Sequence, residues 1–338
     1  MGRRALYSWL CIAGLTTLCV GCGPVDLKKL KPTVWKPTAY VMVDGQVPGW
    51  TPGLAERIAS SAGVVTKAVY TPPTNLVPRL IHVSSAMPRV GLFVVASSGQ
   101  MPIAVANWAK SHPNARLEWV GGGSAAGKLS NVRQLTMNQT TVSYLLGWLA
   151  AEEATIGGNG TVGWDLLSPS ASAGKLKAAL GGSFAANSGV SNVPDSITIA
   201  SPGQVSSTSS SSPKWIVVNY DLDPSEWAAA EASSIRVVSL VSQTLSSPAL
   251  AAEPGYPDAS SMVPDLASFA ARKWRGGTGG TANGSWVQFG SSVNLASISR
   301  LLSAQESIVT SDPSLPESVF ASLPQTVQQA WLSSLSIG

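Results

Sequence analysis

Cysteine is almost absent from this chain. Only three of the 338 residues are cysteine, at Cys11, Cys19 and Cys22, and none occurs further along. The body of the protein therefore has no disulfide, no thiolate metal site and no cysteine nucleophile. Such a body depends on its core, and 44% hydrophobic against 12% charged residues is enough for a large one.

Histidine and clustered charge are also scarce. His82 and His112 are the only histidines, too few for a metal cluster, and neither lies beside a nucleophile elbow. We therefore expect no metal, no cofactor and no enzymatic activity. The net charge is +4, and no Lys and Arg cluster is interleaved with aromatic residues. Nucleic acid is accordingly not an expected partner.

The N-terminus has the pattern of an export signal. Arg3 and Arg4 precede an uncharged, largely apolar run, Ala5–Gly21, that ends in a small residue. The run of about 17 residues is at the short limit for crossing a membrane, so a transmembrane anchor is the alternative. The segment Leu18–Cys22 resembles the bacterial lipobox, in which a cysteine after a small residue is acylated.

This resemblance implies a signal peptide at 1–21 and a lipid, such as palmitate, on Cys22. A linker at 22–37 would follow, with lysines that either face anionic headgroups or are simply solvated. We expect the folded body, residues 38–338, to lie on the extracytoplasmic face of the cell membrane.

Beyond residue 38, short apolar runs alternate with amphipathic ones. This alternation predicts an α/β fold in which parallel strands take turns with helices. The expected strands are 39–43, 64–70, 89–96, 115–120, 161–164, 196–200, 215–219, 235–241 and 285–289. The expected helices are 51–62, 75–85, 103–111, 140–154, 172–186, 225–233, 260–274 and two more after 295 and 317. A stretch rich in Ser and Thr, 204–213, is expected to be a surface loop.

The order of these elements predicts two doubly wound parallel-sheet lobes. Lobe 1 covers about 38–125 and lobe 2 about 155–260. The chain is expected to cross between them near 125–160 and to cross back after about 260. About 300 residues after the signal suit one such two-lobed domain.

Several segments resemble the basic membrane lipoprotein family. They are His112–Leu117, Tyr144–Ala151, Gly160–Trp164 and Asp258–Val263. This resemblance implies a fold of the type I periplasmic-binding-protein kind. It also implies capture of a small solute, nucleoside-like in the studied members, for an ABC transporter and its permease.

The same resemblance fails where ligand contacts are expected. The family's aspartates at one strand end fall on Leu240 and Ser242, and its lysine falls on Pro264. A ribose diol is normally held by charged acceptors, each contributing ~1.5–3 kcal/mol. Ordinary nucleosides are therefore expected to bind weakly, and the ligand to have changed or been lost.

Candidate ligand contacts are Asp44, Trp50, Ser97 and Ser242, because ligands of doubly wound folds collect at the carboxyl ends of strands. Trp50 either stacks on a ligand or simply packs in the core.

Two functions are consistent with these residues. The first is a binding lipoprotein that closes on a small solute for an ABC permease. The alternative is a degenerate binding fold that acts as a surface sensor or regulator without transport.

Overall fold

The computed structural model describes residues 36–99, 101–122, 129–156, 162–167, 173–186, 214–290 and 295–334. The expected signal peptide, Cys22 and nearly all of the linker at 22–37 lie outside the described residues, as do the expected strand 196–200 and the loop 204–213. Residues from Pro37 onward form one compact unit. Within the described ranges, no helix combines the length and apolar character needed to cross a membrane.

The first sheet has six parallel strands in the order β10-β5-β4-β3-β1-β2. They are β1 (Thr38–Val43), β2 (Val65–Tyr70), β3 (Val90–Ser97), β4 (Leu117–Gly121), β5 (Val132–Thr136) and β10 (Gly279–Thr281). The buried residues of β1 alternate between two hydrophobic clusters, one on each face of the sheet. A sheet covered on both faces is the arrangement that parallel strands require.

The second sheet has the order β11-β9-β8-β7-β6 among the described strands. They are β6 (Val162–Asp165), β7 (Trp215–Val218), β8 (Arg236–Ser239), β9 (Leu250–Pro254) and β11 (Val287–Phe289). All pair in parallel except β11, which runs antiparallel to β9. The expected α/β class with two mainly parallel sheets is confirmed.

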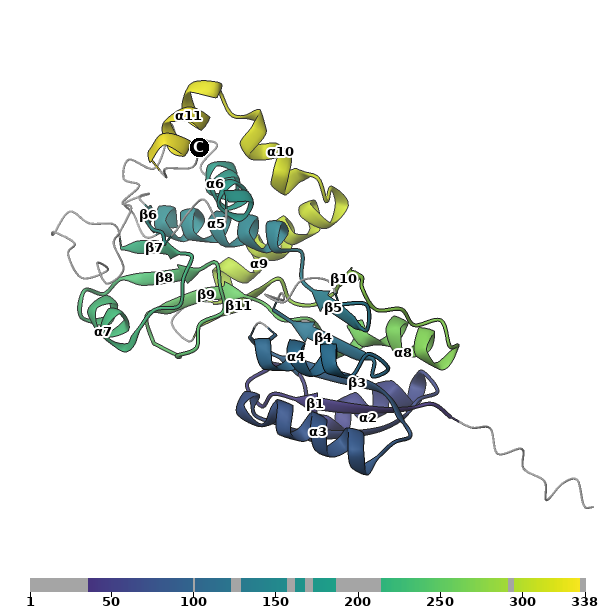
Figure 1. Cartoon of the computed structure of the whole chain (residues 1–338). Coiled ribbons are helices and arrows are strands. Elements are labelled where there is room, and N and C mark those ends of the chain that lie inside the picture. Colours follow the sequence, from purple (N-terminus) through teal and green to yellow (C-terminus); the bar gives the residue numbers. More distant parts are fainter. Residues whose placement is uncertain are drawn as a thin grey trace, which may run out of the picture. The chain divides into compact units, whose positions relative to one another are not determined.

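Helices cover both faces of each sheet (Figure 1). The described α-helices are α2 (Pro52–Ser61), α3 (Leu76–Ala86), α4 (Ile103–Ser111), α5 (Gln139–Ile156), α6 (Ala173–Ala186), α7 (Pro224–Ala232), α8 (Val263–Ala270), α9 (Leu295–Ser311), α10 (Leu315–Ser322) and α11 (Gln325–Ser334). On the first sheet, α3 and α4 share one cluster, whereas α2 and α8 contribute to the cluster on the opposite face. On the second sheet, α7 lies opposite α5 and α6.

Helices α5 and α6 pack with almost no gap between their backbones. A Cβ on Gly147 would lie 1.9 Å from the carbonyl oxygen of Ala179, and one on Gly182 would lie 1.9 Å from that of Tyr144. Two glycines therefore permit this contact, and Ser183 adds a hydrogen bond of 2.8 Å to the Gly147 carbonyl. The segment Tyr144–Ala151, which carries most of the family resemblance, is thus accounted for by helix packing.

Three short strands were missing from the sequence-based prediction. β5 has only two buried residues and polar ones between them, and β9 is Leu-Ala-Ala-Glu-Pro, which has weak strand propensity. β10 lies within the glycine-rich segment 276–280 and continues to Thr281. Its glycine-rich composition is typical of a turn, but pairing with β5 makes it an edge strand.

The C-terminal helices also differ from expectation. The single helix expected at 260–274 is a 3-10 turn, Ala259–Met262, followed by α8, which ends before Arg272 adopts a left-handed conformation with φ of 59°. The two helical stretches expected after 295 and 317 are three helices. Pro316 and Pro324 lie at the starts of α10 and α11, where proline is tolerated.

Three segments connect the two sheets and lie against one another. They run from β5 to α5, from β9 to the turn at Ala259, and from β10 to β11. Pro257 pairs with Gly284, and Ala282 donates a hydrogen bond of 2.9 Å to the Thr136 carbonyl. The chain returns to the first sheet between β9 and Ala259 and crosses once more between β10 and β11.

Candidate functional site

A pocket of about 230 Å³ lies where strands of both sheets end. The first sheet contributes residues at the carboxyl ends of β3, β4 and β5, and the second contributes those that follow β8 and β9. The first turns of α5 and α6 complete the wall. The lining residues are Ser98, Gly99, Gly121, Gly122, Thr136, Met137, Gln139, Lys175, Leu240, Val241, Ser242, Pro254, Gly255, Tyr256 and Pro257. Carboxyl ends of parallel strands are where α/β folds bind ligands.

Asp44 and Ser97 lie one layer behind this pocket. They occupy the ends of β1 and β3, the point in the first sheet where the strand order reverses. The Asp44 carboxylate is only 2% exposed and accepts hydrogen bonds from the hydroxyls of Ser97 at 3.4 Å and Ser98 at 3.3 Å. It also accepts one from the backbone N–H of Gln46 at 3.1 Å. Asp44 therefore orients Ser98, and Ser98 is the residue of this group that reaches the pocket.

Trp50 occupies a packing position. It is 3% exposed, its indole N–H donates to the Pro257 carbonyl at 2.7 Å, and its ring meets Tyr256 edge-on with centroids 6.4 Å apart. Trp50 is absent from the pocket lining. Of the two roles considered for this residue, the geometry matches core packing, and stacking on a ligand would require the ring to move out of its contact with Tyr256.

Tyr256 fastens the segment after β9 to the first sheet. Its hydroxyl lies within hydrogen-bond distance of the Ser97 carbonyl, at 2.7 Å, and of the Val120 carbonyl. Gly121 makes this possible, because its φ is 136° and a Cβ there would lie 2.0 Å from the Ser97 oxygen and 2.6 Å from the Tyr256 hydroxyl. Trp50 and Tyr256 together hold one of the three connecting segments in place.

Of the three residues that replace the family's charged contacts, two line the pocket and one does not. Leu240 and Ser242 both line the pocket, which agrees with the strand-end position inferred for them. Pro264 lies in the first turn of α8 and is not among the lining residues. Neighbouring Gln243 donates to the Tyr220 carbonyl at 2.9 Å and to the Ser239 hydroxyl at 2.6 Å, so it stabilises the loop after β8.

Lys175 is the one charged side chain among the described lining residues. It lies in the first turn of α6 and is half-buried, and its ammonium donates to the side-chain oxygen of Gln139 at 3.2 Å. Burial lowers the pKa of Lys175 below its ordinary value. The sequence-based prediction did not include this residue, because the pattern of this helix does not separate Lys175 from Lys177, which lies outside the pocket.

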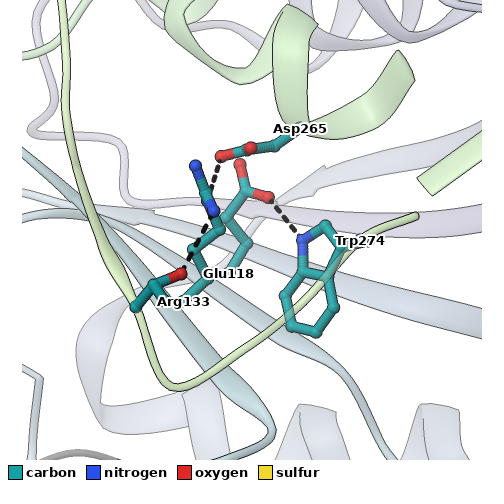
Figure 2. Close-up of polar contacts among 5 residues, drawn as sticks. Glu118, Arg133, Asp265 and Trp274 are labelled. Carbon is teal, nitrogen blue, oxygen red and sulfur yellow. Dashed lines mark hydrogen bonds and ion pairs between the residues drawn. The ribbon is translucent and has the colours of Figure 1, made fainter. Parts of the chain in front are cut away.

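An ionic cluster, separate from the pocket, lies on the face of the first sheet beneath α8 (Figure 2). Glu118 of β4 is fully buried and accepts a hydrogen bond of 3.3 Å from the Trp274 indole. Beside it, Arg133 of β5 donates to Asp265 of α8 at 2.7 Å. Burial, and then the Asp265 charge, raise the pKa of Glu118 to about 8. No residue of this cluster lines the pocket, so we interpret it as structural.

Comparison with known proteins gives a fold likeness without a family. No family model and no curated protein matches the chain, so membership of the basic membrane lipoprotein family is not confirmed. The chain is similar to a solved ABC transporter solute-binding protein from Conexibacter woesei, at 14% identity, with a TM-score of 0.46, over 81% of this chain and 96% of that one.

Two further solved structures are similar to a comparable degree. One is a carbohydrate transporter solute-binding protein from Agrobacterium radiobacter in complex with D-arabinose, at 13% identity, a TM-score of 0.43 and coverage of 80% and 99%. The other is a transcriptional activator of the comK gene from Bacillus halodurans, at 11% identity, a TM-score of 0.45 and coverage of 82% and 98%. At these scores the likeness carries no argument about a ligand or an activity.

Proposed function

We propose that this protein is an extracytoplasmic binding protein that takes a small solute into the pocket between the strand ends. The position of this pocket carries the proposal. Its wall comes from both sheets and from the segment Pro254–Pro257 that connects them. A solute that contacts both sheets is favoured when they approach each other, which is the basis of hinge closure. Delivery to an ABC permease and a lipid anchor on Cys22 belong to the same proposal.

Apart from Lys175, the described lining suits an uncharged, hydrogen-bonding portion of a solute. Ser98, Thr136 and Ser242 offer hydroxyl groups, while Met137 and Leu240 offer apolar contact. A nucleoside is the class that the family resemblance implies. However, Leu240 and Ser242 supply no carboxylate for a ribose diol, so we expect adenosine, guanosine, inosine and uridine to bind no more tightly than about millimolar.

A pocket-filling variant tests the proposal. We would titrate the full chain by calorimetry with these nucleosides, with neutral sugars and with anionic counterparts of both. Ser242→Trp places a large ring at an exposed lining position, whereas Ser246→Trp places the same ring on the same loop outside the pocket. We expect saturable binding of a solute by the wild type and Ser246→Trp, and its loss in Ser242→Trp. Binding that Ser242→Trp leaves intact would place the site elsewhere.

A flat titration for every solute would favour the alternative, a surface sensor that needs a protein partner. The replacement of the family's acids by Leu240 and Ser242 is the observation in favour of that alternative. Asp44→Ala then separates the two functions in cells. Loss of function in a folded variant indicates a ligand at the strand ends, since Asp44 orients Ser98. An unchanged phenotype indicates partner binding.

The lipid anchor has its own test. Cys22→Ala should abolish labelling by a fatty-acid probe in cells. In the expected lipobox the acylated cysteine follows a small residue, and Cys22 follows Gly21. Cys19→Ala is the matched control and should leave labelling in place. If Cys22→Ala is still labelled, the lipoprotein part of the proposal is wrong.

A further inference from the structure

The ammonium group of Lys175 has an incomplete set of partners. It can donate three hydrogen bonds, and one goes to the Gln139 side-chain oxygen at 3.2 Å. No described carboxylate lies within ion-pair distance of it. Gln139 is itself fixed, since its amide nitrogen donates to the Met137 carbonyl at 3.5 Å. Among the described residues, two donors of the lysine therefore remain without a partner at a wall of the pocket.

Holding a cation in this position opposes folding. Desolvation alone lowers the pKa of Lys175, with no opposing contribution from a nearby carboxylate. A charge that is taken partly out of water is normally compensated by a paired counter-charge. Arg133, another partly buried cation, is paired in this way with Asp265. Lys175, at the pocket, has no such partner among the described residues.

The surroundings strengthen the positive potential. Gln139 begins α5, a helix of 18 residues, and Lys175 lies in the first turn of α6, a helix of 14 residues, so two helix N-termini contribute partial positive charge to the same wall. No carboxylate is among the described lining residues. The nearby Asp44 carboxylate lies behind Ser98 and accepts three hydrogen bonds of its own.

We propose that the solute bound in this pocket carries an anionic group, a carboxylate or a phosphate, that is held by the Lys175 ammonium. This inference rests on the proposed function and names the chemical class of its ligand. The uncharged remainder of the solute would face the hydroxyls of Ser98, Thr136 and Ser242 on the other walls. An anion there completes the hydrogen bonding of Lys175 and replaces the solvation that the pocket removes.

Matched pairs of solutes test the proposal. The pairs are glucuronate against glucose, and inosine 5′-monophosphate against inosine, titrated into the full chain at constant ionic strength. The variants are Lys175→Met, which removes the charge at similar length, and Lys177→Met, a half-buried lysine of the same helix outside the pocket. Lys175→Arg is added to keep the charge. Circular dichroism confirms that each variant is folded.

We expect the anionic member of at least one pair to bind the wild type about 10- to 100-fold more tightly than its neutral partner. That preference should disappear in Lys175→Met, persist in Lys177→Met and be largely kept in Lys175→Arg. A carboxylate site favours glucuronate and a phosphate site favours the monophosphate. If neutral and anionic members bind equally in the wild type and in Lys175→Met, the anionic ligand is wrong while the binding function stands. If no solute of either pair binds, both proposals are contradicted.

Discussion

Lys175 and Arg133 are both cations held partly out of water, but they are compensated differently. Arg133 has the Asp265 carboxylate at 2.7 Å, and its neighbour Glu118 has the Trp274 indole at 3.3 Å (Figure 2). Among the described residues, Lys175 has only the neutral side-chain oxygen of Gln139 as a partner. Arg133 is thus paired with a carboxylate within the chain, whereas Lys175 has no carboxylate partner among the described residues. An unpaired charge that lines a pocket is a candidate binding group for another molecule.

The first prediction breaks the Arg133–Asp265 ion pair and has the largest expected effect. Arg133→Met leaves Asp265 and Glu118, two buried carboxyls, without a cation. Removing one partner of a buried pair costs ~3–5 kcal/mol, and we expect about 2–4 kcal/mol because the Arg133 side chain is 26% exposed. Denaturant unfolding of the variant measures this loss in the free energy of unfolding.

The double variant Arg133→Met with Asp265→Asn is the control. It removes the stranded charge and should recover a large part of the lost stability. Lys67→Met, at an exposed lysine on β2, should change the free energy of unfolding by less than about 0.5 kcal/mol. A cost for Arg133→Met no larger than that of Lys67→Met would mean that the cluster contributes nothing.

The second prediction concerns the pH dependence of the same cluster. Burial and the Asp265 charge raise the pKa of Glu118 from 4.5 to about 8. The folded protein therefore keeps a proton that the unfolded chain releases at lower pH. The stability that this proton contributes is complete below about pH 4.5 and is lost as pH rises towards about 8, with a slope of at most ~1.4 kcal/mol per pH unit.

Glu118→Gln removes this titration and retains an oxygen that can accept the Trp274 hydrogen bond. We expect the variant to be about 1–2 kcal/mol more stable than the wild type at pH 8, with the difference shrinking towards pH 5. Denaturant unfolding at several pH values measures it. Parallel stability curves for the two proteins would show that Glu118 does not titrate in this range.

The third prediction concerns Lys175, whose removal should raise the free energy of unfolding slightly, whereas removal of Arg133 lowers it. Lys175→Met removes an uncompensated cation, so in the absence of solute the variant should be about 0.5–1 kcal/mol more stable than the wild type. Lys177→Met should leave stability nearly unchanged. A loss of stability in Lys175→Met, measured by thermal or denaturant unfolding, would mean that the lysine is already compensated within the chain.

Sequence patterns predicted the layers of this fold more completely than the pocket. Long apolar runs such as Ala39–Val43 and the helix at 140–154 are determined by local pattern. β10, by contrast, is a strand only because β5 lies beside it, and the sequence Gly-Gly-Thr contains no such information. Because β5 and β9 were not predicted from the sequence, two of the strand ends that form the pocket were not predicted either.

Among the four candidate residues, position along the chain was predicted better than side-chain role. Ser242 lines the pocket, Asp44 and Ser97 lie directly behind it, and their contact with a ligand stays a prediction. Trp50 follows the first strand as expected, but the direction of its ring depends on Tyr256, more than 200 residues away in the chain. Lys175 could be placed at the wall only by knowing that the first turns of α5 and α6 lie side by side.

The pKa of Lys175, followed by NMR of isotope-labelled lysine side chains in the full chain, tests the central claim most directly. The Lys175 signal is identified by its absence from the spectrum of Lys175→Met. In the free protein we expect a pKa below the ordinary value of 10.5, because burial disfavours the ammonium form. Saturation with glucuronate or inosine 5′-monophosphate should raise that pKa, because an anion beside the ammonium stabilises its charge. An ordinary pKa in the free protein, or a depressed one that neither anion changes, would contradict the account.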